Sequence, residues 1–155
     1  MERDLRAADI ALFAIGRRGS LPRDIGPLPD EAAEALAAMS GLYEVSGFTK
    51  PWIGYVAVAE TVPVGICGFK SPPENGRVEI AYFTFPKFEG RGVATLMAAK
   101  LAVLASTADP DVVIAAQTLP TRGPSHRILE KLGFRHVETV DHADDGSVFE
   151  WHLER

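Results

Sequence analysis

The sequence has one cysteine, Cys67, and lacks any long apolar run. A single cysteine excludes an intrachain disulfide and is typical of proteins in a reducing compartment. No stretch reaches the roughly 20 apolar residues that span a membrane, and the charged residues 1–6 do not resemble a secretory signal. We therefore expect a cytoplasmic protein with no membrane partner.

Basic charge is also scarce, since the chain has 16 Lys and Arg against 21 Asp and Glu, a formal net charge of −5. Nucleic-acid binding requires a basic surface, so we expect no nucleic-acid partner. The four histidines, His126, His136, His142 and His152, lack the spacing of metal ligands, and we expect no metal. The length of 155 residues and the hydrophobic content of 46% fit a single domain over residues 1–155.

The rest of the chain is organised around residues 78–105. Residues 78–85 are rich in aromatic and β-branched side chains, which predicts a strand. Gly90 and Gly92 then flank Arg91, and apolar residues follow at the three- and four-residue spacing of one helix face. Glycine allows a tight turn and the close approach of a ligand, and a helix N-terminus offers free N–H groups and partial positive charge. This strand, turn and helix predict a phosphate site.

Two common phosphate-binding motifs do not fit this turn. A Walker loop needs Gly-x-x-x-x-Gly-Lys-Ser/Thr, and the chain has no such run. A dinucleotide-binding turn needs a third glycine where Thr95 stands, and an acidic residue about 20 positions further on, where the sequence is apolar. A nucleotide-binding domain is therefore disfavoured.

A third kind of loop fits residues 89–94, which read EGRGVA. They resemble the pyrophosphate loop of the GNAT family of N-acetyltransferases, Gln/Arg-x-x-Gly-x-Gly/Ala, with Glu89 as the one departure. Residues 125–134, SHRILEKLGF, are similar to the helix ending in Leu-Gly-Phe that follows the fifth strand of that family. The resemblance covers the second half of the chain well and the first half in outline.

The resemblance implies an α/β (α+β) fold with a mixed, mostly antiparallel central sheet flanked by helices. It also implies an N-acetyltransferase in which an amine attacks acetyl-CoA directly, without an acyl-enzyme. The acceptor is a small-molecule or peptide amine that the sequence does not identify. The alternative is a non-catalytic domain of the same fold that binds CoA as a sensor or interaction module.

The same resemblance implies which residues would hold the acyl carrier. The pyrophosphate would lie on backbone N–H groups of the glycine turn, at Gly90, Arg91, Gly92, Val93 and Ala94. Pantetheine would pair with the central strand through the backbone of Phe83 and Phe85. Ser125 is either a further carrier contact or the N-terminal cap of its helix.

Glu79 is the candidate general base, because it interrupts an apolar run in which a charge has no packing role. Partial burial disfavours ionisation of a carboxyl group, which suits a base that works near neutral pH. The other interpretation is a structural residue that is solvated or paired with Arg77 or Arg135. The family's usual acid, a tyrosine, has Leu129 at its position, and Arg122 stands where many members have asparagine.

The first half of the chain is predicted to contain two helices and two strands. The expected helices cover residues 2–15 and 30–39, the second ending at Ser40-Gly41. The expected strands cover residues 52–59 and 64–69, as antiparallel neighbours leading into the central strand.

The second half is predicted to continue with a strand, a helix and a hairpin. Residues 112–116 form a strand parallel to the central one and, by the resemblance, splayed away from it; residues 124–132 form a helix. Residues 136–140 and 147–152 pair around Asp144-Asp145-Gly146. The last strand, at or near a sheet edge, carries large apolar side chains, so we expect a possible homodimer.

Overall fold

The computed structural model describes residues 5–6, 9–142 and 146–154 and contains a seven-stranded sheet of order β1-β2-β3-β4-β5-β7-β6. The strands are β1 Ile10–Ala14, β2 Gly54–Ala59, β3 Val62–Phe69, β4 Arg77–Thr84, β5 Val113–Thr118, β6 Phe134–His142 and β7 Gly146–Leu153. The helices are α1 Ala32–Ser46, α2 Val93–Ala108 and α3 Pro124–Leu132, with a short 3₁₀ turn, η2, at Pro86–Phe88. β4 and β5 run parallel and the other neighbouring strands run antiparallel, which confirms the predicted fold class.

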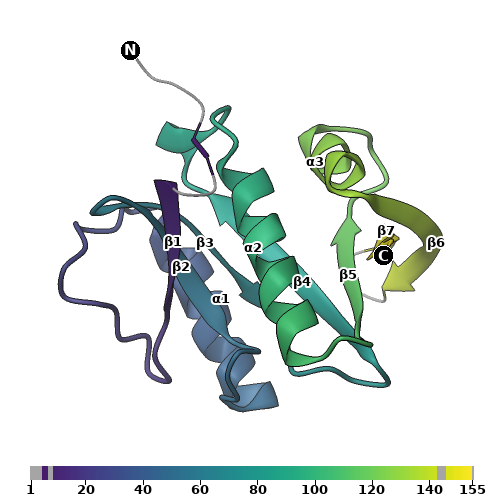
Figure 1. Ribbon diagram of the computed structural model, residues 1–155, viewed down its shortest axis with the longest axis horizontal. Helices are drawn as coiled ribbons and strands as arrows, with labels where there is room; N and C mark the ends of the chain where they lie inside the picture. The colour runs from purple at the N-terminus through teal and green to yellow at the C-terminus, as the bar shows by residue number, and fades with distance from the viewer. Residues whose placement is uncertain (1–4, 7–8, 143–145, 155) are drawn as a thin grey trace.

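Helices cover both faces of the sheet (Figure 1). Two glycines of β3 show why they pack closely: a Cβ on Gly65 would lie 2.9 Å from Met97 of α2, and one on Gly68 would lie 3.0 Å from Met39 of α1. On the α1 side, the Tyr43 hydroxyl donates to the carbonyl of Ile15 at 2.9 Å and accepts the N–H of Gly54 at 2.8 Å. These contacts hold α1 against the N-terminal half of the sheet.

The predicted first helix, residues 2–15, is wrong over Ile10–Ala14, which forms β1. This strand pairs with β2 from Ile10–Ala59 to Ala14–Tyr55. The apolar spacing in this stretch suits a helix, but the backbone groups of β2 offer a ladder of hydrogen bonds that a helix could not complete. Tertiary pairing therefore outweighs the local pattern.

The predicted end of the second helix at Ser40-Gly41 is also wrong, because α1 continues to Ser46. Met39 and Tyr43 lie on the same buried face, so packing on both sides of Gly41 keeps the helix intact. An interior glycine costs about 1 kcal/mol relative to alanine, which this packing exceeds. The helix ends at Gly47, whose φ is +83°.

The later elements agree with the sequence predictions, including α3 from Pro124 to Leu132 and the pairing of β6 with β7. Asp144 and Asp145 of the predicted turn lie outside the described residues. The last strand was expected at or near a sheet edge, and β7 lies one strand in from the edge, between β5 and β6. Val148 and Trp151 of β7 are buried, so the original reason for a homodimer no longer holds.

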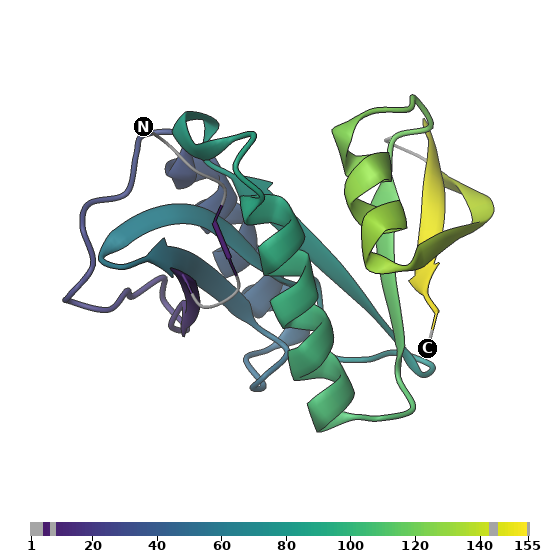
Figure 2. The same cartoon turned by 45° about the horizontal axis from the view of Figure 1, so that its top comes forward.

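The parallel strands β4 and β5 pair over a short length and then separate. Their register covers Arg77–Val113, Val78–Ile114 and Glu79–Ala115. Figures 1 and 2 show the strands meeting at one end and parting toward the ends at which α2 and α3 begin. The two strands splay apart, as the family resemblance predicted. Glu79 is the last paired residue of β4 and lies where the fork between the strands closes.

Candidate functional site

A groove of about 520 Å³ lies between the open end of β4, the N-terminus of α2 and the start of α3. Six of the residues predicted to bind the carrier line it: Phe83, Gly90, Gly92, Val93, Ala94 and Ser125. Two others do not. Phe85 is fully buried, and the guanidinium of Arg91 lies 5.6 Å from the centre of the Phe88 ring.

The glycine turn leaves open space beside its backbone. Gly90 and Gly92 have φ values of +78° and +83°, in the left-handed region that favours glycine. A Cβ on Gly90 would meet nothing within 4 Å, and one on Gly92 would meet only the Leu5 carbonyl oxygen, at 3.8 Å. Gly92 is the N-cap of the 16-residue α2, so the first N–H groups and the positive end of the helix dipole lie at the groove. This wall can hold an anion.

The strand wall of the groove has an open backbone edge. The Phe85 N–H donates to Val64 of β3 at 3.0 Å, whereas the Gly76 carbonyl accepts from Val113 of β5 at 2.8 Å. Hydrogen-bonding direction alternates along a strand, so Tyr82 and Thr84, not Phe83 and Phe85, direct their N–H and C=O groups toward the open side. Thr84 lines the groove, and its buried Oγ1 has no hydrogen-bond partner among the described residues.

The helix wall of the groove begins at α3. Gly123 is its N-cap and Pro124 its first residue, so Ser125 is not the cap. Ser125 instead shares a hydrogen bond with Tyr82 from the opposite wall; burial raises the pKa of Tyr82 to about 12, although this bond opposes the rise. Leu129 is fully buried, and Arg122 pairs with Glu130 at 3.0 Å.

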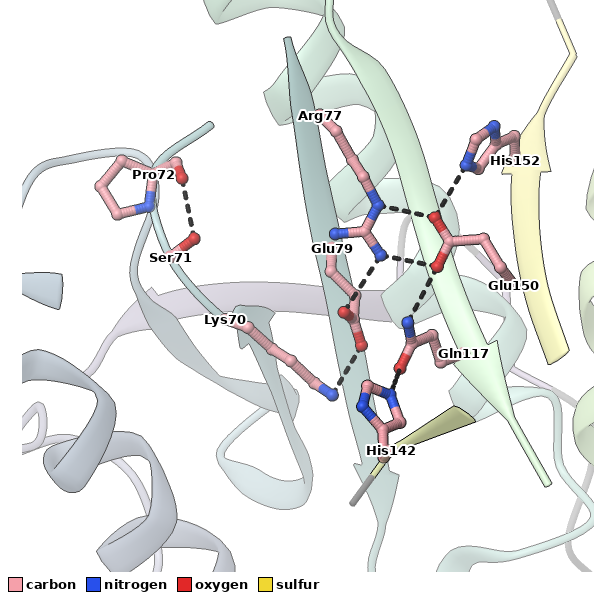
Figure 3. A network of polar contacts seen from close by, with 9 residues as sticks. All are labelled: Lys70, Ser71, Pro72, Arg77, Glu79, Gln117, His142, Glu150 and His152. Atoms are coloured by element: carbon pink, nitrogen blue, oxygen red, sulfur yellow. Dashed lines mark hydrogen bonds and ion pairs between the residues drawn. The ribbon is translucent and has the colours of Figure 1, made fainter. Parts of the chain in front are cut away.

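Glu79 lies at the closed end of the fork, in contact with two cations (Figure 3). Its Oε2 is 2.6 Å from Lys70 Nζ and its Oε1 is 3.2 Å from Arg77 Nη2, and its side chain is 12% exposed. The predicted partner Arg77 is therefore present, whereas Arg135 pairs with Glu154 at 3.0 Å.

Sequence reasoning did not identify Glu150, a second carboxylate beside Glu79. Arg77 donates to its two oxygens at 2.6 and 2.7 Å, and Gln117 and His152 each donate at 2.9 Å (Figure 3). Burial raises the pKa of Glu150, but the hydrogen bonds from Arg77, Gln117 and His152 outweigh it and lower the pKa to about 2. The available signal was the same as for Glu79, an acidic residue within an apolar strand.

Two further findings concern the described part of the chain. In residues 5–6, 9–142 and 146–154, no group of three or more His, Cys, Asp or Glu side chains is arranged to hold a metal ion. Among those same residues, no helix is both long enough and apolar enough to cross a membrane.

Comparison with known proteins identifies relatives of this arrangement. Residues 3–135 match the model of a family described as Acetyltransferase (GNAT) domain. N-acetylaspartate synthetase of Homo sapiens is 29% identical over 89 residues, which are 57% of this chain and 29% of that protein. The chain thus spans less than a third of the length of this curated relative.

Solved structures share the fold. A chimera of spermidine N-acetyltransferase from Vibrio cholerae and hSSAT superposes with a TM-score of 0.66 at 13% identity, covering 94% of this chain and 95% of that one. An aminoglycoside acetyltransferase in complex with coenzyme A and kanamycin superposes with a TM-score of 0.55 at 22% identity, covering 66% of each chain. At these identities, the likeness concerns the fold.

Proposed function

Since the chain belongs to the GNAT family of acetyltransferases, we propose that it transfers an acetyl group from acetyl-CoA to an amine acceptor. The observation that carries this proposal is the groove between the open end of β4, the N-terminus of α2 and the start of α3. It combines the positive end of α2 with an open edge of β4 at Tyr82 and Thr84. These features suit the pyrophosphate and the amides of a CoA chain.

The length of β4 that is not paired with β5 supports the same ligand. Ile80 to Thr84 is four residue steps along the strand, roughly 13 Å. Between its sulfur and its phosphate, pantetheine has about as many bonds as the backbone of four residues, so its extended length is also roughly 13 Å. With the pyrophosphate on Gly90, Gly92, Val93 and Ala94, the thioester would lie close to Glu79.

The carrier would then pair with the open backbone groups of Tyr82 and Thr84 and pass Phe83 and Ser125, which line the groove. Phe85 would support this strand from the core, and Arg91 would stay over Phe88 at the turn. N–H groups on the open edge, such as that of Tyr82, can donate to the oxyanion formed when the amine attacks the thioester.

Glu79 is proposed to accept the proton of the attacking amine. It is the last residue of β4 that pairs with β5, and its side chain is 12% exposed. The nitrogen forms a bond to the acetyl carbon, the C–S bond breaks, and the thiolate takes a proton from solvent. Leu129 is buried and its side chain has no acidic proton, so it cannot protonate the thiolate.

The acceptor is proposed to be a small-molecule or peptide amine. A homodimer remains a prediction without its original basis in β7, and a cytoplasmic location remains a prediction from composition. The competing function is a CoA-binding module without turnover, which the apolar side chain of Leu129 favours.

Two measurements test these proposals. Calorimetry with CoA and acetyl-CoA tests the groove, and absence of heat with both ligands would reject carrier binding. Release of thiol from acetyl-CoA across a panel of amines tests catalysis. Binding without release for any amine would favour the non-catalytic module.

A further inference from the structure

Lys70 brings a primary amine to the proposed base. It directly follows β3, and its backbone N–H donates to the Glu79 carbonyl at 3.0 Å, so the two residues are cross-strand neighbours. Lys70 Nζ lies 2.6 Å from Glu79 Oε2. The Lys70 side chain is 47% exposed, whereas that of Glu79 is 12% exposed. The amine is therefore held at the carboxylate while remaining open to solvent.

This contact lies at the closed end of the fork. Glu79 is the last residue of β4 that pairs with β5, and a carrier with its phosphates at Gly92 would extend along the unpaired part of β4 toward it. An amine, a carboxylate and the acetyl group would then meet at one point. We propose that Lys70 is acetylated by the protein's own active site when no other acceptor is bound, an inference that rests on the proposed function.

The chemistry uses only groups already described and acetyl-CoA. Glu79 takes one proton from the Lys70 ammonium, and the neutral Nζ attacks the acetyl carbon. A C–N bond forms, the C–S bond breaks, and the electron pair leaves with sulfur. The nitrogen loses a second proton as the amide forms, one proton ends on the thiolate, and the other passes from Glu79 to solvent. No oxidant or further reactant is required.

The other lysines provide internal controls. The chain has five lysines, the others being Lys50, Lys87, Lys100 and Lys131. Lys87 is exposed, and its ammonium lies 5.9 Å from the Phe88 ring at the groove. Lys70 and Lys87 are both exposed to acetyl-CoA in solution, but no ion pair with a carboxylate is seen for Lys87 in the described part of the chain. Lys87 thus reports non-enzymatic acetylation.

The test is to incubate the whole chain with acetyl-CoA alone and to follow each lysine by peptide mass spectrometry. Lys70 should be acetylated about 10²-fold or more faster than Lys87, since general-base assistance contributes about 10²–10⁴. The rate should not depend on protein concentration, because the reaction is intramolecular. Glu79→Gln should slow the labelling of Lys70 and leave that of Lys87 unchanged, and Lys70→Arg should remove the first acetyl group to be added.

Calorimetry on the same sample separates the two levels of the proposal. If CoA binds but Lys70 and Lys87 are acetylated at equal rates, the assignment of Lys70 is overturned while carrier binding stands. Labelling of Lys70 that rises with protein concentration would also overturn it, since one molecule would then be modifying another. If neither CoA nor acetyl-CoA binds, the proposed function fails, and the self-acetylation fails with it.

Discussion

Arg77 of β4 holds Glu150 of β7 across the intervening strand β5, through hydrogen bonds of 2.6 and 2.7 Å to the two carboxylate oxygens (Figure 3). The Glu150 side chain is only 5% exposed, so the pair replaces much of the water that this carboxylate would have in an unfolded chain. The interaction ties three strands together beside the closed end of the fork. It also raises the pKa of Arg77, for which the hydrogen bond to Glu150 is the largest cause.

This pair predicts acid sensitivity. Glu150 has a pKa of about 2 in the folded chain against an ordinary value of 4.5, so its stabilisation is complete above pH 4.5 and is lost as the pH falls toward 2. The loss should reach up to about 3 kcal/mol. Urea unfolding of Glu150→Gln at pH 7 and pH 3 should show a smaller difference between the two pH values than wild type.

The matched control is Glu154→Gln, which removes an exposed carboxylate paired with Arg135 and should change stability by less than about 1 kcal/mol. The interpretation of Glu150 is wrong if Glu150→Gln keeps the full acid sensitivity of wild type.

The three tyrosines, Tyr43, Tyr55 and Tyr82, predict the behaviour at alkaline pH. Burial raises the pKa of all three, to about 12 for Tyr55 and Tyr82. The unfolded chain ionises first, near pH 10, so stability is lost as the pH rises from 10 toward 12. Ultraviolet titration should show phenolate appearing together with the loss of circular dichroism. A tyrosine that ionises reversibly near pH 10 in the folded protein would contradict this expectation.

The parts of the structure that sequence predicted best are those defined by local signals. The turn at Gly90 and Gly92 and the end of α3 at Gly133 all use glycine with positive φ, which is a property of single residues. The strand and helix around the turn have their own apolar periods. The groove proposed to hold the carrier could therefore be predicted from one continuous stretch and one helix.

The parts that could not be predicted depend on contacts between distant residues. The cluster around Glu79 combines β4 with β7, and Arg77 and Glu150 are 73 positions apart. β1 was missed because its partner strand, β2, lies more than 40 positions further on. Phe83 and Phe85 were predicted to face the open edge, but Tyr82 and Thr84 do so. Telling the two pairs apart requires knowing which N–H groups of β4 bond to β3. None of these facts leaves a repeated spacing in the sequence.

A side chain at Gly92 should weaken carrier binding by more than the backbone strain that it introduces can explain. Gly92→Ala and Gly76→Ala introduce a Cβ at φ values of +83° and +77°, so each should cost about 1–2 kcal/mol of stability. Only the Gly92 methyl group would occupy the proposed phosphate site, and it should weaken CoA at least tenfold, or about 1.4 kcal/mol. Calorimetry on both variants decides. If the two variants bind CoA with equal affinity, the phosphate does not bind at this turn.

Glu89 lines the groove and brings a negative charge to the proposed phosphate site. Glu89→Gln should therefore tighten CoA binding by roughly 3- to 10-fold, about 1 kcal/mol, and the gain should shrink as salt is added. The control Glu74→Gln changes the net charge equally, but Glu74 lies in the turn before β4, away from the groove. An affinity that is unchanged in Glu89→Gln, or that rises equally in both variants, would show that Glu89 does not face the phosphates.

Glu79→Gln tests the proposed base. Glutamine keeps the size of the side chain and one acceptor oxygen, which can serve either Lys70 or Arg77, but it cannot accept a proton from an amine. Turnover with the acceptor found in the amine panel should fall by about 10²–10⁴. CoA affinity should stay within about twofold of wild type, since Glu79 does not line the carrier groove. Steady-state kinetics and calorimetry on the same preparation separate the two effects, with Glu74→Gln as the folded control. If turnover stays near wild type, the amine enters already neutral, and removal of water from the closed end of the fork becomes the better account of catalysis.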